Sequence, residues 1–310
     1  MTERSTPIGG LEGLAVIVTG GGTGIGRACA ARLARDGAAV TICGRRENLL
    51  LESVDQIDSV IAQAKSTGRV QHVVADVTDE DEVKKVVEFA LAPTGSLDGC
   101  VANAGGGGGM GPYHLQNTAE FIRVLHLNVL GTLYFVKHTI PHMVAAGGGS
   151  FVGMSSIAGH QTHPYFGAYT VSKAGIEQMM RNAADEYGPV RVRFNAIRPG
   201  FISTEIMEGI PRTSPVYESY IANTPMQDVG EPEDVAALAR FLISPEARWI
   251  TGQIINIDGG HSLRRGPDFS AFIEPALGRD VMLAKSAPKA GPSGLSERKA
   301  GPSGPQRKAR

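Results

Sequence analysis

The chain has 310 residues, long enough for one large domain or two small ones, with a substantial hydrophobic core. Hydrophobic residues make up 42% and charged residues 20%, a balance that excludes disorder of the whole chain. The formal net charge of −1 argues against nucleic acid or an anionic membrane surface as the main partner.

The three cysteines lie in segments that are predicted to be helix or strand interiors, at Cys29, Cys43 and Cys100. None has the spacing of a metal site, so we expect reduced thiols, no metal and a cytoplasmic protein. The first ten residues lack the apolar core of a secretory signal. No uninterrupted run approaches about 18 apolar residues, so no membrane-spanning helix is expected.

Short apolar segments alternate with amphipathic ones from residue 14 to about residue 257. The predicted strands are 14–18, 39–43, 70–75, 97–102, 150–154, 190–197 and 253–257. The predicted helices are 24–35, 50–64, 79–91, 117–146, 168–187 and 231–244. Apolar strands separated by helices indicate a parallel sheet that is covered on both faces. We therefore predict an α/β fold over residues 10–265: a doubly wound, Rossmann-like, seven-stranded sheet in three α/β/α layers.

Two segments depart from this alternation. Residues 201–228 are apolar but interrupted by three prolines, and we interpret them as a lid or binding loop rather than a disordered linker. After an extension at 266–283, residues 284–310 repeat the sequence Lys-Ala-Gly-Pro-Ser-Gly and are strongly basic. That composition predicts a disordered tail, with binding of an anion or a partner as the alternative.

A glycine-rich turn follows the first predicted strand and precedes the first helix. It reads Gly20-Gly-Gly-Thr-Gly-Ile-Gly26. Such a turn lets the backbone approach a pyrophosphate, which the free N–H groups of the helix N-terminus then bind. Glycine also serves ordinary tight turns, but the position between strand and helix predicts dinucleotide binding.

The second strand is expected to end beside the adenine ribose. NAD sites usually present a carboxylate there. This chain instead has Arg45, followed by Arg46, and the first carboxylate is Glu47. A guanidinium at Arg45 would pair with a 2′-phosphate, so NADP is predicted rather than NAD. The alternative is that Arg45 is a solvated surface residue.

Tyr169 and Lys173 are four residues apart at the start of a predicted helix and share one of its faces. A nearby ammonium, together with the positive charge of an oxidised nicotinamide, favours the phenolate, so we expect a lowered pKa for Tyr169 and a role as general acid or base. Such a pair also occurs by chance on protein surfaces. Here Ser156 lies thirteen residues earlier, at the end of the fifth strand, where α/β proteins bind ligands.

Together, these motifs resemble the short-chain dehydrogenase/reductase family, over roughly residues 10–263. The ordered motifs are Gly-x-x-x-Gly-x-Gly at 20–26, Asp76-Val77, Asn103-Ala104-Gly105, Asn128, Ser156, Tyr169-x-x-x-Lys173 and Pro199-Gly200. No single motif is specific, but the set in this order is. The resemblance also implies a homo-oligomer, either a tetramer or a dimer.

The resemblance implies a role for each motif residue. Tyr169 would be the catalytic acid or base, Ser156 would polarise the carbonyl, and Lys173 would hold the nicotinamide ribose. Asn128 would hold a water molecule that links Lys173 to solvent. The residues expected to contact the cofactor are Gly20, Gly22, Thr23, Gly24, Ile25, Gly26, Arg45, Asp76, Val77, Asn103, Ala104, Gly105, Tyr169, Lys173, Pro199, Gly200, Ile202 and Thr204.

The predicted function is an NAD(P)-dependent oxidoreductase that interconverts a secondary alcohol and a ketone. The apolar lid favours a large apolar substrate, steroid-like or acyl. An epimerase is disfavoured by the glycine spacing, and enoyl reduction by the short interval between Tyr169 and Lys173. His160 and His163 are interpreted as lining or structural residues. The rival function is a dinucleotide-binding sensor or scaffold without turnover, which gives no reason for Ser156, Tyr169 and Lys173 all to be present.

Overall fold

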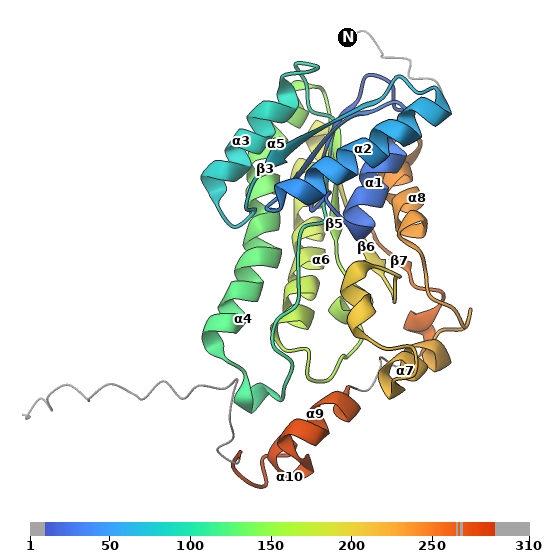
Figure 1. The fold of residues 1–310 in the computed structure, drawn as a ribbon. Helices are drawn as coiled ribbons and strands as arrows, with labels where there is room; N and C mark the ends of the chain where they lie inside the picture. The colour runs from blue at the N-terminus through green and yellow to red at the C-terminus, as the bar shows by residue number, and fades with distance from the viewer. Residues whose placement is uncertain (1–9, 265, 267–268, 289–310) are drawn as a thin grey trace, which may run out of the picture.

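The structure, a computed structural model, describes residues 10–264, 266 and 269–288. These residues form a central parallel sheet with helices on both faces (Figure 1). Its strands are β1 (Ala15–Thr19), β2 (Ala39–Gly44), β3 (Arg69–Val74), β4 (Gly99–Ala102), β5 (Gly149–Met154), β6 (Val192–Pro199) and β7 (Ile254–Ile257). The seven-stranded, doubly wound fold predicted from the sequence is confirmed.

The strand order is β3-β2-β1-β4-β5-β6-β7, and every neighbouring pair is parallel. The chain therefore runs outward from β1 to β3 and then returns to the other side of β1 at β4. Because the winding direction reverses there, the connections after β1 and β4 leave on opposite faces of the sheet, which opens a crevice at its carboxyl edge.

The helices divide between the two faces of the sheet (Figure 1). They are α1 (Gly24–Arg35), α2 (Glu47–Ala64), α3 (Glu80–Leu91), α4 (Thr118–Leu125), α5 (Gly131–Ala145), α6 (Ala168–Tyr187), α7 (Pro215–Asn223), α8 (Pro232–Ile243), α9 (Ser270–Leu277) and α10 (Arg279–Met282). Buried residues of α1, α2 and α8 form one hydrophobic core with the sheet. Those of α3, α5 and α6 form a second core on the opposite face.

The helix predicted at 117–146 contains a π-helical segment, His126–Leu130, between α4 and α5. Among the described residues, Thr118–Ala145 is long and apolar enough to cross a membrane by length and composition alone, although polar and charged residues interrupt its apolar runs. In this fold, one face of α5 is part of a hydrophobic core, where Phe135 and Met143 are buried.

The remaining differences concern segments without regular periodicity. The strand predicted from residue 190 begins at Val192, because Gly188–Val190 forms a 3₁₀ turn that contains Pro189. The segment at 201–228 contains α7, and the extension at 266–283 contains α9 and α10. From residue 289 onward, the predicted basic tail lies outside the described residues.

Candidate active site

A cleft of about 280 Å³ opens at the carboxyl ends of β1, β2 and β4. Most of the residues predicted to bind a cofactor line it: Gly20, Gly22, Thr23, Gly24, Ile25, Arg45, Asp76, Val77, Asn103, Ala104, Gly105 and Thr204. The lining residues that were not predicted from the sequence are Gly44, Arg46, Leu49, Leu50, Ala75, Leu127 and Glu205. The position of Arg46 next to Arg45 in the sequence could have indicated that it also lines the cleft. Nothing in the sequence indicated Leu127, because the π-helical segment that carries it was not predicted.

The other predicted cofactor residues do not line this cleft. Gly26 instead packs against the turn, since a Cβ there would lie 2.1 Å from the carbonyl oxygen of Gly20. Gly200 follows the end of β6 and donates a backbone hydrogen bond to Ile257 at 2.8 Å. Ile202 is buried and pairs with Gly230 in an isolated bridge. Pro199 is the last residue of β6, and Tyr169 and Lys173 lie on α6.

The glycine-rich turn has a backbone that requires glycine. Gly20 and Gly24 have φ angles of +66° and +49°, in the left-handed region that residues with a Cβ rarely adopt. The N–H groups of Gly20 and Gly21 both donate to the carbonyl of Cys43, which ties the turn to β2. Helix α1 then begins with no acidic residue in its first turn. Its N-terminus is therefore suited to an anion.

Arg45 lies at the end of β2 on the rim of the cleft, with 70% of its side chain exposed. One guanidinium nitrogen is 3.7 Å from a carboxylate oxygen of Asp76. Partial burial raises the pKa of Asp76, but hydrogen bonds from Thr78 and the charge of Arg45 outweigh this effect and hold the pKa below its ordinary value. Asp76 is therefore an anionic acceptor, and Arg45 is a cation that can reorient toward a ligand.

Ser156 and the Tyr169–Lys173 pair come from different elements. Ser156 lies just after β5, and Tyr169 and Lys173 lie in the first two turns of α6. The Ser156 hydroxyl accepts from the backbone N–H of Ala158 at 3.2 Å and lies close enough to Tyr169 to lower the pKa of its phenol. The ammonium of Lys173 lies 5.6 Å from the ring centroid of Tyr169 and donates to the carbonyl of Met154 at 2.8 Å. The fold thus brings these three side chains together.

The protein groups around Tyr169 by themselves shift its pKa upward, opposite to the shift predicted from Lys173 and an oxidised nicotinamide together. Burial raises the pKa of Tyr169, and the nearby hydroxyl of Ser156 opposes this effect only in part. Lys173 is buried as well, and the loss of hydration lowers its pKa to about 8. The cost of removing a charged phenolate from water is the largest of these effects on Tyr169, and the spacing of Tyr169 and Lys173 in the sequence does not reveal it.

Two asparagine side chains hold backbone segments around the site. Asn103 donates to the carbonyl of Thr19 at 3.0 Å, which joins the ends of β4 and β1. Asn128 is fully buried, exchanges hydrogen bonds with the backbone of Gly106, and donates to the hydroxyl of Ser172 at 2.8 Å. Both amides therefore have structural partners. The water-holding role of Asn128 remains a prediction.

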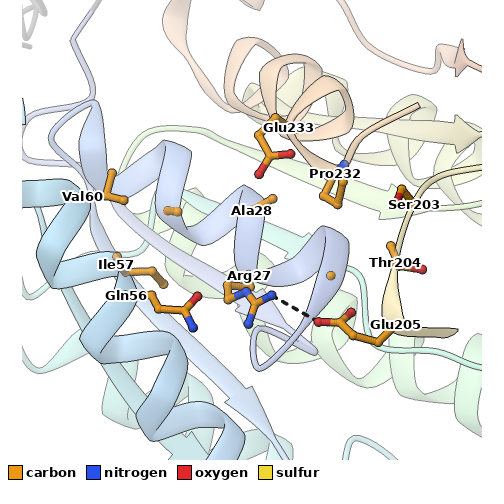
Figure 2. Close-up of a pocket in the computed structure, with 12 residues that line it drawn as sticks. Arg27, Ala28, Gln56, Ile57, Val60, Ser203, Thr204, Glu205, Pro232 and Glu233 are labelled. Atoms are coloured by element: carbon orange, nitrogen blue, oxygen red, sulfur yellow. Dashed lines mark hydrogen bonds and ion pairs between the residues drawn. The ribbon is translucent and has the colours of Figure 1, made fainter. Parts of the chain in front are cut away.

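A second pocket of about 380 Å³ adjoins the cleft and shares Gly24, Thr204 and Glu205 with it. Figure 2 shows Arg27 of α1 pointing toward Glu205, at the start of the segment between β6 and α8. Their charged atoms are 3.2 Å apart, and both side chains are partly exposed. This ion pair connects the helix that follows the glycine-rich turn to the predicted lid.

Aromatic residues from distant parts of the chain pack together beside Tyr169. Phe201 and Tyr220 are stacked with ring centroids 4.4 Å apart, and Phe269 lies 4.4 Å from Phe166. Phe166 in turn contacts Tyr169 edge to face, with centroids 5.7 Å apart. Residues of the lid and Phe269 therefore form an apolar cluster next to the candidate catalytic residues.

The two histidines between Ser156 and Tyr169 have different surroundings. His160 is exposed. His163 is buried against Tyr220, and one of its ring nitrogens lies 3.0 Å from the carbonyl of Gln161. Burial lowers the pKa of His163 to about 4, so its ring is neutral at neutral pH and donates to that carbonyl. Structural hydrogen bonding, one of the two predicted roles, fits His163.

Comparisons with known proteins agree with this geometry. A family model described as enoyl-(acyl carrier protein) reductase matches residues 20–262. A cis-4-hydroxycyclohexanecarboxylate dehydrogenase of Sinomonas cyclohexanicum is 36% identical over 79% of this chain and 95% of its own length. A 7alpha-hydroxysteroid dehydrogenase of Escherichia coli K12 is 33% identical over 81% of this chain and 94% of its own length.

Solved structures agree as well. A short-chain type dehydrogenase/reductase from Mycobacterium ulcerans superimposes with a TM-score of 0.86 at 43% identity and covers 88% of this chain and 98% of its own. A 7 alpha-hydroxysteroid dehydrogenase complexed with NADH and 7-oxo glycochenodeoxycholic acid superimposes with a TM-score of 0.75 at 32% identity. The match covers 81% of this chain and 95% of that protein's chain. With the family model and these relatives spanning its sheet and candidate site, the chain belongs to the short-chain dehydrogenase/reductase family.

Proposed function

We propose that this protein is an NADP-dependent oxidoreductase that interconverts a secondary alcohol and a ketone on an apolar substrate. The observation that carries the proposal is the proximity of Ser156, Tyr169 and Lys173 at the carboxyl edge of the sheet. The cleft over the glycine-rich turn lies at the same edge. A dinucleotide site alone would not need these three side chains.

The cleft residues fit a dinucleotide. The left-handed glycines and the N-terminus of α1 would hold the pyrophosphate, and Asp76 would accept from the adenosine portion. Arg45 would pair with the 2′-phosphate that distinguishes NADP from NAD. The bound nicotinamide would supply or accept the hydride. The choice of NADP rests on Arg45, whereas the related 7 alpha-hydroxysteroid dehydrogenase is complexed with NADH.

The proposed proton chemistry belongs to Tyr169. Because burial raises its pKa, the phenol is protonated at neutral pH and can donate its proton to a substrate carbonyl oxygen during reduction. The hydroxyl of Ser156, which lies beside the phenol of Tyr169, would orient and polarise the same oxygen. Lys173 would hold the nicotinamide ribose and place a positive charge beside the ring of Tyr169. In the oxidation direction, Tyr169 would act as the base.

The apolar cluster beside Tyr169 supports the substrate class. Its partly exposed rings, Phe166 and Tyr217, would favour flat or aliphatic groups over sugars. Relatives are named for hydroxysteroid, hydroxycyclohexanecarboxylate and levodione substrates, and the first two of these are cyclic alcohols. We therefore propose a cyclic or long-chain apolar ketone, with residues 201–228 as its lid.

We also propose a cytoplasmic homo-oligomer. Exposed apolar side chains along α4, α5 and α6 support self-association, among them Ile122, Leu133 and Val171. The three buried, unpaired cysteines fit a reducing compartment.

The test is Tyr169→Phe, which removes only the phenolic proton. We expect NADPH affinity to persist while ketone reduction falls by about 100-fold or more. Tyr187→Phe, at the other end of the same helix, is the matched control and should retain turnover. Near-normal activity of Tyr169→Phe would refute the assignment. Wild-type protein that binds NADPH but turns over no ketone would favour the sensor or scaffold function.

The substrate panel should include an enoyl thioester beside a 3-oxoacyl thioester and cyclic ketones. The matching family model carries an enoyl reductase description, whereas the four-residue interval between Tyr169 and Lys173 favours ketone reduction. Faster reduction of the enoyl thioester than of every ketone would overturn the proposed reaction class.

A further inference from the structure

A buried polar network lies directly behind the candidate catalytic residues. Its members are Ser155, Glu177 and Arg198, which are 3%, 3% and 9% exposed. They come from the end of β5, the middle of α6 and β6, three elements that pack against one another (Figure 1). The proposed mechanism uses none of them.

The contacts within this network are close and directional. Two guanidinium nitrogens of Arg198 donate to the two carboxylate oxygens of Glu177, each at 2.5 Å. The hydroxyl of Ser155 donates to one of these oxygens at 2.8 Å and lies 3.2 Å from the carbonyl oxygen of Lys173. A bidentate pair of this kind fixes orientation as well as distance.

Stability alone gives no reason to bury this pair. Removing two charges from water is costly, and apolar side chains of similar volume often replace a buried ion pair with no loss of stability. The surrounding cores are built from apolar side chains on both faces of the sheet. A planar, bidentate ion pair holds the segments that it joins in one defined arrangement, which apolar packing does not do.

Those segments carry the candidate catalytic groups. Ser155 immediately precedes Ser156, and Glu177 lies one helical turn after Lys173. Arg198 immediately precedes Pro199-Gly200 at the end of β6. The network therefore joins the serine, the Tyr–Lys helix and the segment expected beside the nicotinamide.

The turn that follows Ser156 also presses on this network. A Cβ at Gly159 would lie 2.9 Å from the hydroxyl oxygen of Ser155 and 2.9 Å from a carboxylate oxygen of Glu177. Only a residue without a side chain lets the turn approach so closely. The turn that begins after Ser156 is thus packed directly against Ser155 and Glu177.

We propose that Glu177 and Arg198, through Ser155, are positioning residues that set the geometry between Ser156 and the Tyr169–Lys173 pair. This inference rests on the proposed oxidoreductase function. Small displacements are costly for such chemistry, because a shift of about 1 Å in a reacting group can reduce a rate by about 100-fold.

The central test is the double variant E177M/R198M, which removes both charges and keeps apolar volume. We expect a melting temperature close to that of the wild type and an NADPH dissociation constant within about twofold, because neither residue lines the cleft. We expect kcat for ketone reduction to fall by about 10- to 100-fold. Ser155→Ala, which leaves the ion pair in place, should show a smaller loss of kcat with the same unchanged NADPH affinity.

The singles Glu177→Gln and Arg198→Met leave one buried charge without its partner, so they are expected to lose stability as well as turnover. If either of these single variants fails to fold, the double variant and Ser155→Ala still test the proposal. The matched control is Arg240→Met, which breaks the ion pair between Arg240 and Asp36 outside the candidate site. It should lower the melting temperature and leave kcat at 25 °C unchanged.

The outcomes separate the two proposals. If the wild type reduces ketones and Tyr169→Phe does not, while E177M/R198M retains wild-type kcat, the positioning role is wrong and the oxidoreductase stands. If E177M/R198M loses kcat only in proportion to lost folded protein or lost NADPH binding, the network is merely structural. A wild type without ketone turnover overturns both proposals.

Discussion

Tyr169 experiences two opposing effects on its proton. Burial disfavours the phenolate and raises the pKa, whereas the nearby hydroxyl of Ser156 favours the phenolate and lowers it. Lys173, with a pKa lowered to about 8, is still mostly protonated at pH 7. The protein by itself therefore holds Tyr169 in the protonated form that the proposed ketone reduction needs, and the positive charge of an oxidised nicotinamide would favour the phenolate in the oxidation direction.

Arg45 allows a test of cofactor choice at a single side chain. If it pairs with the 2′-phosphate, Arg45→Ala should weaken NADPH binding by about 10- to 100-fold, the effect of losing a hydrogen bond to a charged group. NADH binding should change little, because NADH lacks that phosphate. Fluorescence titration of both cofactors measures this, with Arg32→Ala, at the far end of α1, as the control. An equal loss of affinity for NADPH and NADH would indicate that Arg45 has only a structural role.

His163 predicts a pH dependence of stability. Its pKa is about 4 in the folded protein and about 6.5 in an unfolded chain, so the unfolded state binds the proton more tightly. The contribution of His163 to the stability of the folded protein is therefore fully present above about pH 6.5, and it is lost as the pH falls toward 4. When the pH falls from 7 to 5, protonation of His163 in the unfolded state should lower the free energy of unfolding by about 2 kcal/mol.

The measurement is urea unfolding at both pH values for the wild type and for His163→Gln, whose side-chain amide can replace the donor to Gln161. The variant should lose less stability between pH 7 and pH 5 than the wild type does. His160→Gln, an exposed neighbour, should behave like the wild type. An identical pH dependence in His163→Gln would contradict the assignment.

At the scale of elements, α7, α9 and α10 depend on contacts from outside themselves. Each is nine residues or shorter, below the length at which an isolated helix is stable in water. They are stabilised by packing, with Tyr220 of α7 contacting Phe269, just before α9. The lid and the C-terminal helices therefore share one apolar cluster.

Phe269→Ala tests whether that cluster contributes to global stability. Phe269 is 1% exposed and contacts Phe166, Tyr220 and Phe272. Removing a buried phenyl ring usually costs about 3–5 kcal/mol, and we expect a loss of about 3 kcal/mol in chemical denaturation. Leu263→Ala, at an 84% exposed position, should change stability by less than about 0.5 kcal/mol. An unchanged stability in Phe269→Ala would mean that this segment unfolds separately.

At the scale of the whole molecule, the strand order creates the candidate site. All seven strands are parallel, so their carboxyl ends share one edge, and the reversal between β1 and β4 opens the cleft there. The ends of β5 and β6 supply Ser156 and Pro199-Gly200 at the same edge. Residues that lie far apart in the chain thereby surround one site.

The sequence by itself determined the features that depend on neighbouring residues. Hydrophobic periodicity predicted the strands and major helices, and α1 and α6 have the predicted ends. The glycine spacing predicted the turn, and the interval between Tyr169 and Lys173 predicted a shared helical face. These features were readable because helix periods and turn conformations are properties of short stretches of chain.

The tertiary structure alone decided the features that depend on distant residues. The ion pair between Glu177 and Arg198, the contact of Phe166 with Phe269, and the helices α9 and α10 have no local signal in the sequence. The raised pKa of Tyr169 belongs with them, because desolvation depends on everything that packs around the phenol. Burial and long-range contacts exist only once the chain has folded, and they determine how the side chains of the candidate site behave.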